Sequence, residues 1–475
     1  MDSSAVIGAP LDPTLKPSRD RAFLGHPSGF GFLAFTEAWE RFSYAGMQAL
    51  LVLYMVDQVL LPGHFERVAG LGPLKAALQG VYGSLSVQAL SSQIFGLYTS
   101  LIYLTPILGG LAGDRWLGRR TAVTVGCLIM AAGHFMMAFD ASFLLALLAL
   151  ILGGGLIKGN IAVQLGHLYA PGDVRRDQAF QLFVLAINFG SIAAPMVCGT
   201  LGEKLGFHYG FAAAGVGMVI GLCIYLAGRS HLPAEPPRTK TSAAAAAPKT
   251  PITAKEWRAV VAILCLIPIF ALVLTPNNQG FNVGVLWWRE FMNLDVFGFR
   301  IPVTWLLSVA SMLAVIGLAL GAVVWRKLAA RGVTPHELTK ITIGAGLAIF
   351  EPLIKAGFSF ASAGMGWKIP LPCLLIWDLT GVAAFVCFYP TGLALVSRAA
   401  PPRLAGALFG AFLLFTVATN YMVGVIGSYY HQLGAGPFWL LHAGLPAISL
   451  AALLAAYKPL KAALGDPDRE VPVAA

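Results

Sequence analysis

The chain has few charged residues and few cysteines for its length. Only 11% of its 475 residues are Asp, Glu, Lys or Arg, against roughly 25% in an ordinary soluble domain. Hydrophobic residues make up 57%, and the mean hydropathy is +0.74. This balance excludes an ordinary soluble enzyme. The six cysteines have no paired spacing, which excludes a disulfide framework or a metal knuckle, and we expect them to be small packing residues.

Motifs of catalysis are also missing from the sequence. It contains no phosphate-binding loop, no HExxH metal pattern and no GxSxG nucleophile turn. We therefore predict no enzyme, no catalytic residues and no metal site, and a membrane-embedded enzyme is the weakest interpretation. The net charge of +10 could indicate nucleic acid as a partner, but its distribution fits membrane topology, and we predict no nucleic-acid binding.

Apolar runs of about 20 residues, the length that spans a bilayer, recur along the whole chain. They predict an all-α membrane protein with about twelve transmembrane helices, whose partner is the lipid bilayer. The expected spans are residues 31–59, 89–112, 119–139, 142–169, 178–200, 208–228, 257–288, 302–325, 339–357, 371–397, 404–430 and 436–457. The amphipathic stretch 68–88 is too polar to span, and we expect it at the outer surface.

The positions of Lys and Arg predict the orientation. If the N-terminus is cytoplasmic, most of the 32 Lys and Arg fall on the cytoplasmic side, as the positive-inside rule requires. No early apolar stretch marks a cleavable signal peptide. We expect a cell inner membrane protein with both termini cytoplasmic. Its parts are a tail (1–30), a six-helix half (31–228), a Pro-, Ala- and Lys-rich linker (229–256), a second six-helix half (257–458) and a tail (459–475).

The first span carries three charged residues in the stretch EAWERFSYAG. Glu37, Glu40 and Arg41 are spaced i, i+3 and i+4, so they project from one face of the helix. Charges at membrane depth cost several kcal/mol and normally face a partner or a watery cavity. One interpretation is an ion pair that only holds helices together. The other is a proton-accepting carboxylate whose proton affinity is controlled by a movable cation.

Two further charged motifs follow in the first half. Lys158, in GGGLIKGN of the fourth span, is either the partner of a first-span glutamate or an anchor for a substrate anion. The loop GGLAGDRWLGRR places Asp114 among three arginines. Such a carboxylate can pair with arginines and hold one conformation as a latch. The predicted latch residues are Asp114, Arg115, Arg119 and Arg120.

These motifs together resemble the proton-dependent oligopeptide transporter family of the major facilitator superfamily. The resemblance is carried by ExxERFSYxG, DRWLGRR, LIKGN, INFG at 187–190, PTGLALVSRAAP at 390–401 and Asn420. It implies two six-helix halves and proton-driven symport of di- and tripeptides, with a proton gradient and no cofactor. It assigns proton coupling to Glu37, Glu40, Arg41 and Lys158. It assigns substrate binding to Tyr44, Gln48, Lys158, Asn160, Asn188, Asn277, Asn278, Gln279, Phe385 and Asn420.

The chain departs from the family pattern at positions that contact peptide in the family. A tyrosine and an arginine of the first helix are replaced by Ala45 and Gln48, and glutamates of the seventh and tenth helices by Asn277 and Phe385. An asparagine of the eighth helix is replaced by Ala310. Without a counter-charge, a buried peptide ammonium is costly. We expect a small peptide-like or organic-anion substrate, with an anionic group for Lys158 and an apolar body, rather than an ordinary peptide.

Other polar residues in the spans have two interpretations each. Asp378 is either a displaced acid that replaces the missing tenth-helix glutamate or a solvated carboxylate near the outer mouth. Glu351 and Lys355, spaced i, i+4, are expected to be a structural pair. His134 and His167 are expected to be hydrogen-bonded packing residues rather than proton relays.

The amides at 277–279 are expected either to line a substrate cavity or to bond helix to helix. The tryptophans expected in an outer interfacial belt are Trp287, Trp288, Trp305, Trp367 and Trp377.

A second functional class is a membrane scaffold or assembly partner that keeps a transporter fold without transporting. Retention of Glu37, Glu40, Arg41 and Lys158 argues against it, because unused buried charges lower stability. Nothing in the sequence indicates an oligomeric state.

Overall fold

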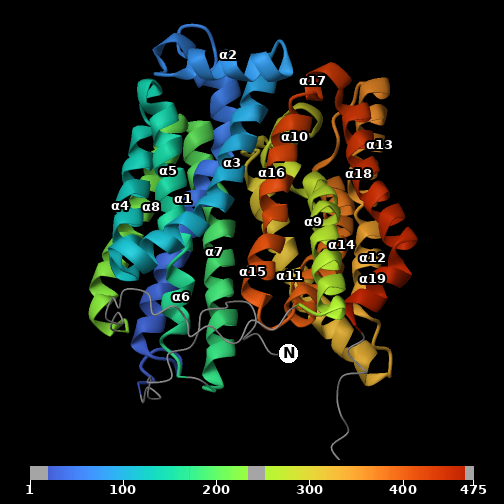
Figure 1. Ribbon diagram of the computed structural model, residues 1–475. Coiled ribbons are helices and arrows are strands. Elements are labelled where there is room, and N and C mark those ends of the chain that lie inside the picture. The colour runs from blue at the N-terminus through green and yellow to red at the C-terminus, as the bar shows by residue number, and fades with distance from the viewer. Residues whose placement is uncertain (1–19, 171, 234–251, 466–475) are drawn as a thin grey trace, which may run out of the picture. The chain divides into compact units, whose positions relative to one another are not determined.

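The computed structural model describes residues 20–170, 172–233 and 252–465, and these are almost entirely helical (Figure 1). Within them, the strands are β1 (Asp295–Val296) and β2 (Phe299–Arg300), an antiparallel hairpin in which Asp295 faces Arg300. Ten helices in this part of the chain are long and apolar enough to cross a membrane. The prediction of an all-α membrane protein is confirmed. Parts of the predicted tails and linker lie outside the described residues: 1–19 and 466–475 in the tails, and 234–251 in the linker.

The chain divides into two compact units, which are described separately. The helices of unit 1 are α1 (Ser28–Tyr54), η2 (Met55–Val59), η3 (Phe65–Arg67), α2 (Leu71–Tyr82), α3 (Val87–Ala112), η4 (Gly113–Leu117), α4 (Arg119–Met136), η5 (Asp140–Ser142), α5 (Phe143–Lys158), α6 (Ile161–Gly166), α7 (Arg175–Lys204), α8 (Phe207–Gly228) and η6 (Arg229–His231). Residues Ile301–Ser311 also belong to unit 1.

The helices of unit 2 are α9 (Ala254–Asn278), η7 (Gln279–Phe281), α10 (Val283–Phe291), α11 (Trp305–Ala330) from Met312 onward, α12 (Glu337–Leu347), α13 (Phe350–Met365), η8 (Leu371–Cys373), α14 (Leu374–Ala399), α15 (Ala405–Phe412), α16 (Leu414–Gly427), α17 (Tyr430–Leu433), α18 (Ala435–Ala455) and α19 (Tyr457–Leu464). Helix α9 begins with a capping box, in which the Thr253 hydroxyl and the Glu256 carboxylate each accept from a backbone N–H of the other residue.

Helix α1 forms the centre of unit 1, where it packs against α7 and α8. It is not among the ten apolar helices, and its middle carries Glu37, Glu40 and Arg41. Helices α3 and α5 also pack closely. A Cβ atom placed on Gly109 of α3 would lie 2.1 Å from the carbonyl oxygen of Gly155 in α5, so these two backbones touch directly.

Several expected spans are interrupted rather than continuous. The span predicted at 142–169 breaks between α5 and α6, and the span predicted at 257–288 breaks at η7, just after Pro276. The ninth span breaks between α12 and α13, and Pro352 lies in the first turn after the break. Proline lacks the N–H that continues a helix, so a break before it is expected. The eleventh span is divided into α15 and α16.

Two surface segments bear on the sequence predictions. Helix α2 forms within the expected surface stretch, and its 12 residues make it roughly 18 Å long, too short to span. Figure 1 shows it lying across the ends of α1 and α3. Residues 457–464, most of which were assigned to a tail, instead form α19, which buries Leu460 and Leu464.

The prediction of a tryptophan belt is wrong for three of its five members. Trp287, Trp288 and Trp377 are almost fully buried in unit 2. The rings of Trp287 and Trp377 pack edge to face at 5.4 Å, and Trp287 packs in the same way against Trp439 at 5.7 Å. Trp287, Trp377 and Trp439 therefore form an aromatic core. Hydropathy along one helix could not predict it, because it does not show which indole rings the neighbouring helices bring to the same place.

Candidate functional site

The charged residues of α1 and α5 meet inside unit 1. The Arg41 Nε atom lies 2.5 Å from Glu40 Oε2 and 3.3 Å from Glu37 Oε1. Lys158, the last residue of α5, places its Nζ 4.0 Å from Glu40 Oε1. Glu40 therefore lies between two cations, one bonded to it and the other just beyond hydrogen-bond distance.

This cluster is buried and incompletely bonded. Glu40 is 0% exposed and Glu37 is 4% exposed. Within the described residues, Glu37 Oε2, Glu40 Oε1 and Lys158 Nζ have no hydrogen-bond partner. An unbonded buried carboxylate oxygen is costly and is a natural place for a proton. With two carboxylates and two cations, the cluster is neutral when all four groups are ionised.

Tyrosines surround the lysine. The Lys158 ammonium lies 4.2 Å from the ring centroid of Tyr44 and 5.5 Å from that of Tyr103, and Arg41 lies 5.4 Å from the Tyr44 ring. The Tyr44 hydroxyl has no hydrogen-bond partner in the described part of the chain. Gln48, one turn further along α1, is half-buried. The aromatic faces stabilise the cation without neutralising it.

Three asparagines predicted to bind substrate lie outside this cluster. Asn160 is fully buried and donates to the carbonyls of Gly109 at 2.9 Å and of Leu156 at 2.8 Å, so it joins α3 to the break after α5. Asn188 and Asn420 each donate to a carbonyl one turn back in their own helix, at 2.8 Å. The bonding of Asn160 favours a packing role.

The amides of α9 and η7 separate into two environments within unit 2. Asn277 and Phe385 line a small cavity of about 20 Å³. Asn278, the residue after Asn277, is half-buried. Gln279 is fully buried and donates to the Val423 carbonyl of α16 at 3.0 Å. The helix-to-helix interpretation therefore applies to Gln279, and substrate binding by Asn277 and Asn278 stays a prediction. The sequence could not separate the two interpretations, because it does not show which side of the helix meets α16.

The predicted latch is partly assembled. The Arg119 Nε donates to Asp114 Oδ1 at 2.9 Å, and the guanidinium lies 3.3 Å from the His167 ring nitrogen Nδ1. Arg120 instead donates to backbone carbonyls just after η6, and Arg115 is exposed. The hydrogen bond that ties α4 to the preceding loop therefore comes from Arg119.

The predictions for His134 and Asp378 need correction. His134 is fully buried in α4, and neither ring nitrogen has a hydrogen-bond partner within the described residues, so the prediction of a hydrogen-bonded packing residue is wrong for it. Asp378 is 8% exposed and is not a solvated carboxylate. In both cases a neighbouring helix covers the side chain, which the sequence of one helix does not show.

An acidic residue that sequence reasoning missed holds the start of α11 within unit 1. The carboxylate of Glu203 in α7 accepts from the backbone N–H groups of Val303 at 2.9 Å and Thr304 at 3.0 Å, and from the Thr304 hydroxyl at 2.6 Å. A carboxylate is favourable at a helix N-terminus, where N–H groups lack partners. Glu203 is far from α11 in the sequence, so no local spacing pattern could have identified it.

A second missed carboxylate caps the start of α1. Asp20 accepts from the Ser28 hydroxyl at 2.7 Å and from the Ser28 backbone N–H at 2.8 Å. The side-chain hydrogen bond from Ser28, followed by the backbone bond, lowers the pKa of Asp20 below its usual value.

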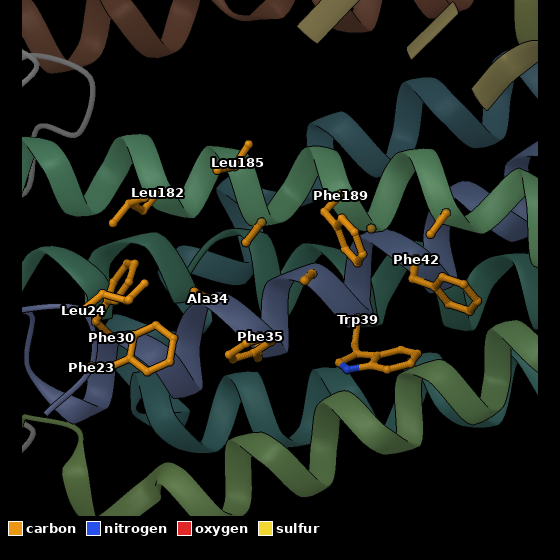
Figure 2. Close-up of a pocket in the computed structure, with 14 residues that line it drawn as sticks. Phe23, Leu24, Phe30, Ala34, Phe35, Trp39, Phe42, Leu182, Leu185 and Phe189 are labelled. Carbon is orange, nitrogen blue, oxygen red and sulfur yellow. The ribbon is translucent and has the colours of Figure 1, made fainter. Parts of the chain in front are cut away.

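An apolar groove of about 490 Å³ lies between α1 and α7 of unit 1. Figure 2 shows its aromatic side chains, among them Phe35, Trp39 and Phe189, on the two helices. None of Glu37, Glu40 and Arg41 lines the groove. It is therefore separate from the charged cluster, and its lining has no polar side chain suited to coupling.

Comparison with known proteins identifies the family. A sequence model described as the POT family matches residues 120–255 and 249–435. The chain belongs to the POT family. Members of this family similar to the chain are transporters rather than enzymes, and the chain is a multi-pass membrane protein.

Individual POT relatives match along much of the chain. The peptide transporter YePEPT of Yersinia enterocolitica is 28% identical over 477 residues, which cover 86% of this chain and 89% of that protein. The di-/tripeptide transporter of Lactococcus lactis subsp. cremoris is 37% identical over 258 residues, which cover 54% of this chain and 46% of that protein. A mutant of the peptide transporter POT solved in complex with alafosfalin superposes with a TM-score of 0.80 at 27% identity, covering 94% of this chain and 98% of that one.

Proposed function

We propose that this POT family member is a proton-coupled symporter whose substrate carries an anionic group. The observation that carries the proposal is the position of Glu40, with Arg41 bonded to one carboxylate oxygen and Lys158 4.0 Å from the other. A proton on Glu40 removes its charge, and the buried cluster then carries a net charge of +1. A substrate anion restores neutrality, so proton and anion favour each other's binding.

The lysine is the proposed anchor for the anion. Its ammonium has no hydrogen-bond partner within the described residues. The nearby tyrosine rings do not neutralise its charge. In the absence of substrate it is attracted to Glu40, and protonation of Glu40 releases it. Competition of the carboxylate and the substrate for one cation links the two ligands.

The substrate is proposed to be peptide-like or an organic anion with an apolar body. The POT relatives named above are peptide transporters. In this chain, however, the position of the tenth-helix glutamate in the family pattern is held by Phe385, whose ring stacks on Tyr389 at 5.1 Å and provides no counter-charge for an ammonium group. A free amino group would therefore contribute little to binding.

The proposed membrane topology is the one inferred from the positions of Lys and Arg along the chain. We propose two six-helix halves, residues 31–228 and 257–458, with the 229–256 linker and both termini on the cytoplasmic side of the inner membrane. The two compact units support this division, although residues Ile301–Ser311 group with the first unit. Labelling of single cysteines placed in α2 and in the linker, from outside intact cells, checks the orientation.

The full-length protein in liposomes with an internal pH dye tests the mechanism. We expect solute-dependent proton entry with the wild type and none with Glu40→Gln or Lys158→Ala. Glu40→Gln should keep exchange of labelled substrate without a gradient, whereas Lys158→Ala should lose it, because the anchor is gone. Glu66→Gln, a change at an exposed carboxylate outside the spans, is the control. Wild-type protein without solute-dependent flux across a panel of peptides, acylated amino acids and organic anions would favour the scaffold.

A matched pair of substrates tests the specificity. A dipeptide and its N-acetylated form differ in the amino group alone. We expect acetylation to leave uptake unchanged or to improve it. Strong proton-driven dipeptide uptake that acetylation abolishes would show that an ammonium site exists, and the proposed substrate class would be wrong.

A further inference from the structure

Unit 2 contains a second buried group of charged side chains, separate from the cluster of α1. Glu351 and Lys355 lie one turn apart on α13, and the Lys355 Nζ is 2.6 Å from Glu351 Oε1. Asp378 comes from the neighbouring helix α14. The three residues are 6%, 3% and 8% exposed, respectively. The predicted pair of Glu351 and Lys355 is present, but it is not isolated.

Asp378 belongs to this group through both its charge and its helix face. It interacts electrostatically with Lys355 and with Glu351. Gly381, one turn further along α14, faces the same glutamate, because a Cβ atom on Gly381 would lie 2.4 Å from Glu351 Oε2. The Asp378 Oδ2 atom has no hydrogen-bond partner within the described residues. A buried carboxylate oxygen therefore lies unbonded beside a second carboxylate.

Aromatic rings shield the group. The Lys355 ammonium is 4.8 Å from the ring centroid of Trp439 in α18, and the Trp287 indole N–H donates to Ser359, one turn beyond Lys355, at 2.8 Å. His442 of α18, whose Nδ1 lies 2.9 Å from the Phe438 carbonyl oxygen, also interacts electrostatically with Lys355. These rings supply no negative or positive charge to balance the group while His442 is neutral.

A small cavity adjoins the group on one side. It has a volume of about 20 Å³, and its lining includes Glu351, Gly381, Asn277 and Phe385. This is enough space for about one water molecule. Glu351 thus contacts Lys355 through one oxygen and also reaches a space where a proton carrier could stand.

The charge balance of the group indicates its ligand. Two ionised carboxylates and one ammonium have a net charge of −1, and a net charge buried at membrane depth is costly. One proton makes the group neutral and fills the bonding capacity of the unpaired carboxylate oxygen. We propose that Glu351, Lys355 and Asp378 form a second proton-binding site, which holds one exchangeable proton on its two carboxylates. Because proton binding is measurable without transport, this site does not depend on the proposed symport.

Infrared spectroscopy of the purified full-length protein tests the site, because a protonated carboxyl group has a C=O band that a carboxylate lacks. At neutral pH the wild type should show a buried carboxyl component that disappears as the pH is raised. Glu351→Gln and Asp378→Asn should each lose it, since either variant leaves one carboxylate and one ammonium. Lys355→Met should keep it, since two carboxylates then remain without a cation. Two independent carboxyl variants keep the test valid if one fails to fold.

Two control variants separate this carboxyl component of the spectrum from those of other carboxyl groups in the protein. Glu40→Gln alters the α1 cluster and Glu66→Gln an exposed carboxylate, and neither should remove the component assigned to unit 2. A component that persists in both Glu351→Gln and Asp378→Asn would overturn the proposal. A wild-type spectrum without the buried carboxyl component would also overturn the proposal, and this is the result expected if His442 held the proton. Loss of the component when sodium replaces choline at constant pH would show that a metal cation is the ligand, and the proposal would then be wrong.

Discussion

The direct contact between α3 and α5 predicts a large effect from one added methyl group. Gly109→Ala would place its Cβ 2.1 Å from the Gly155 carbonyl oxygen and 2.4 Å from the carbonyl carbon. Both are backbone atoms, so no side chain can rotate away. Separating the helices from 2.1 Å to an ordinary contact of 3.4 Å requires a shift of about 1.3 Å, and overpacking of this kind typically costs about 1–3 kcal/mol.

A hydrogen bond adds to this cost. The Asn160 side chain donates to the Gly109 carbonyl at 2.9 Å, and a shift of α3 would break that bond and leave a buried amide unsatisfied, at about 1–3 kcal/mol. The free energy of unfolding should therefore fall by about 2–6 kcal/mol. At about 2–4 °C per kcal/mol for a unit of this size, the melting temperature should fall by roughly 4–24 °C.

Gly110→Ala is the matched control, because its Cβ would meet the Gly159 carbonyl oxygen at 3.4 Å, an ordinary contact. Both variants gain the same helix propensity, so this gain cancels in the comparison. Thermal unfolding of the two full-length variants in the same detergent measures the difference. Equal melting temperatures would refute the direct backbone contact and the positions assigned to α3 and α5.

Three further perturbations follow from the contacts described. Glu203→Gln removes the charge that caps α11 and should lower the free energy of unfolding by about 1 kcal/mol, measured by thermal unfolding, whereas an unchanged melting temperature would argue against the cap. Because the pKa of Asp20 is lowered in the folded state, its contribution is present above the unfolded value and lost as the pH falls through the folded one. Asp20→Asn should therefore flatten the acid limb of a stability–pH profile, and an unaltered limb would contradict this. Gln279→Leu deletes a buried interhelical hydrogen bond and should reduce stability by about 1 kcal/mol, in contrast to Asn278→Leu at a half-buried position.

Much of the architecture follows from the sequence, because the membrane imposes long apolar helices. The charged cluster was also predictable. Glu37, Glu40 and Arg41 share one helix face by spacing alone, and the cost of a charge in lipid implies a partner, which the structure provides in Lys158. These conclusions use one helix and one general rule. They did not require knowing how the helices are arranged.

What the sequence could not predict depends on contacts between helices. Asp378 and Trp377 were assigned to the outer mouth or the interface, yet both are buried, and the rings of Phe358 in α13 and Trp287 in α10 pack against Trp377. Asn160 was assigned to substrate, yet it bonds to α3. Periodicity identifies the side of a helix on which a residue lies, whereas burial depends on which helix packs against that side.

The end of α5 at Lys158 has an electrostatic consequence. Because the helix stops there and α6 starts afresh at Ile161, the peptide groups of α5 end at the lysine. Their aligned dipoles give this end a partial negative charge of about half an electron. The ammonium therefore stands in a favourable potential that belongs to the backbone and does not change with pH. Loss of a carboxylate neighbour consequently costs Lys158 less than it would in the middle of an unbroken helix.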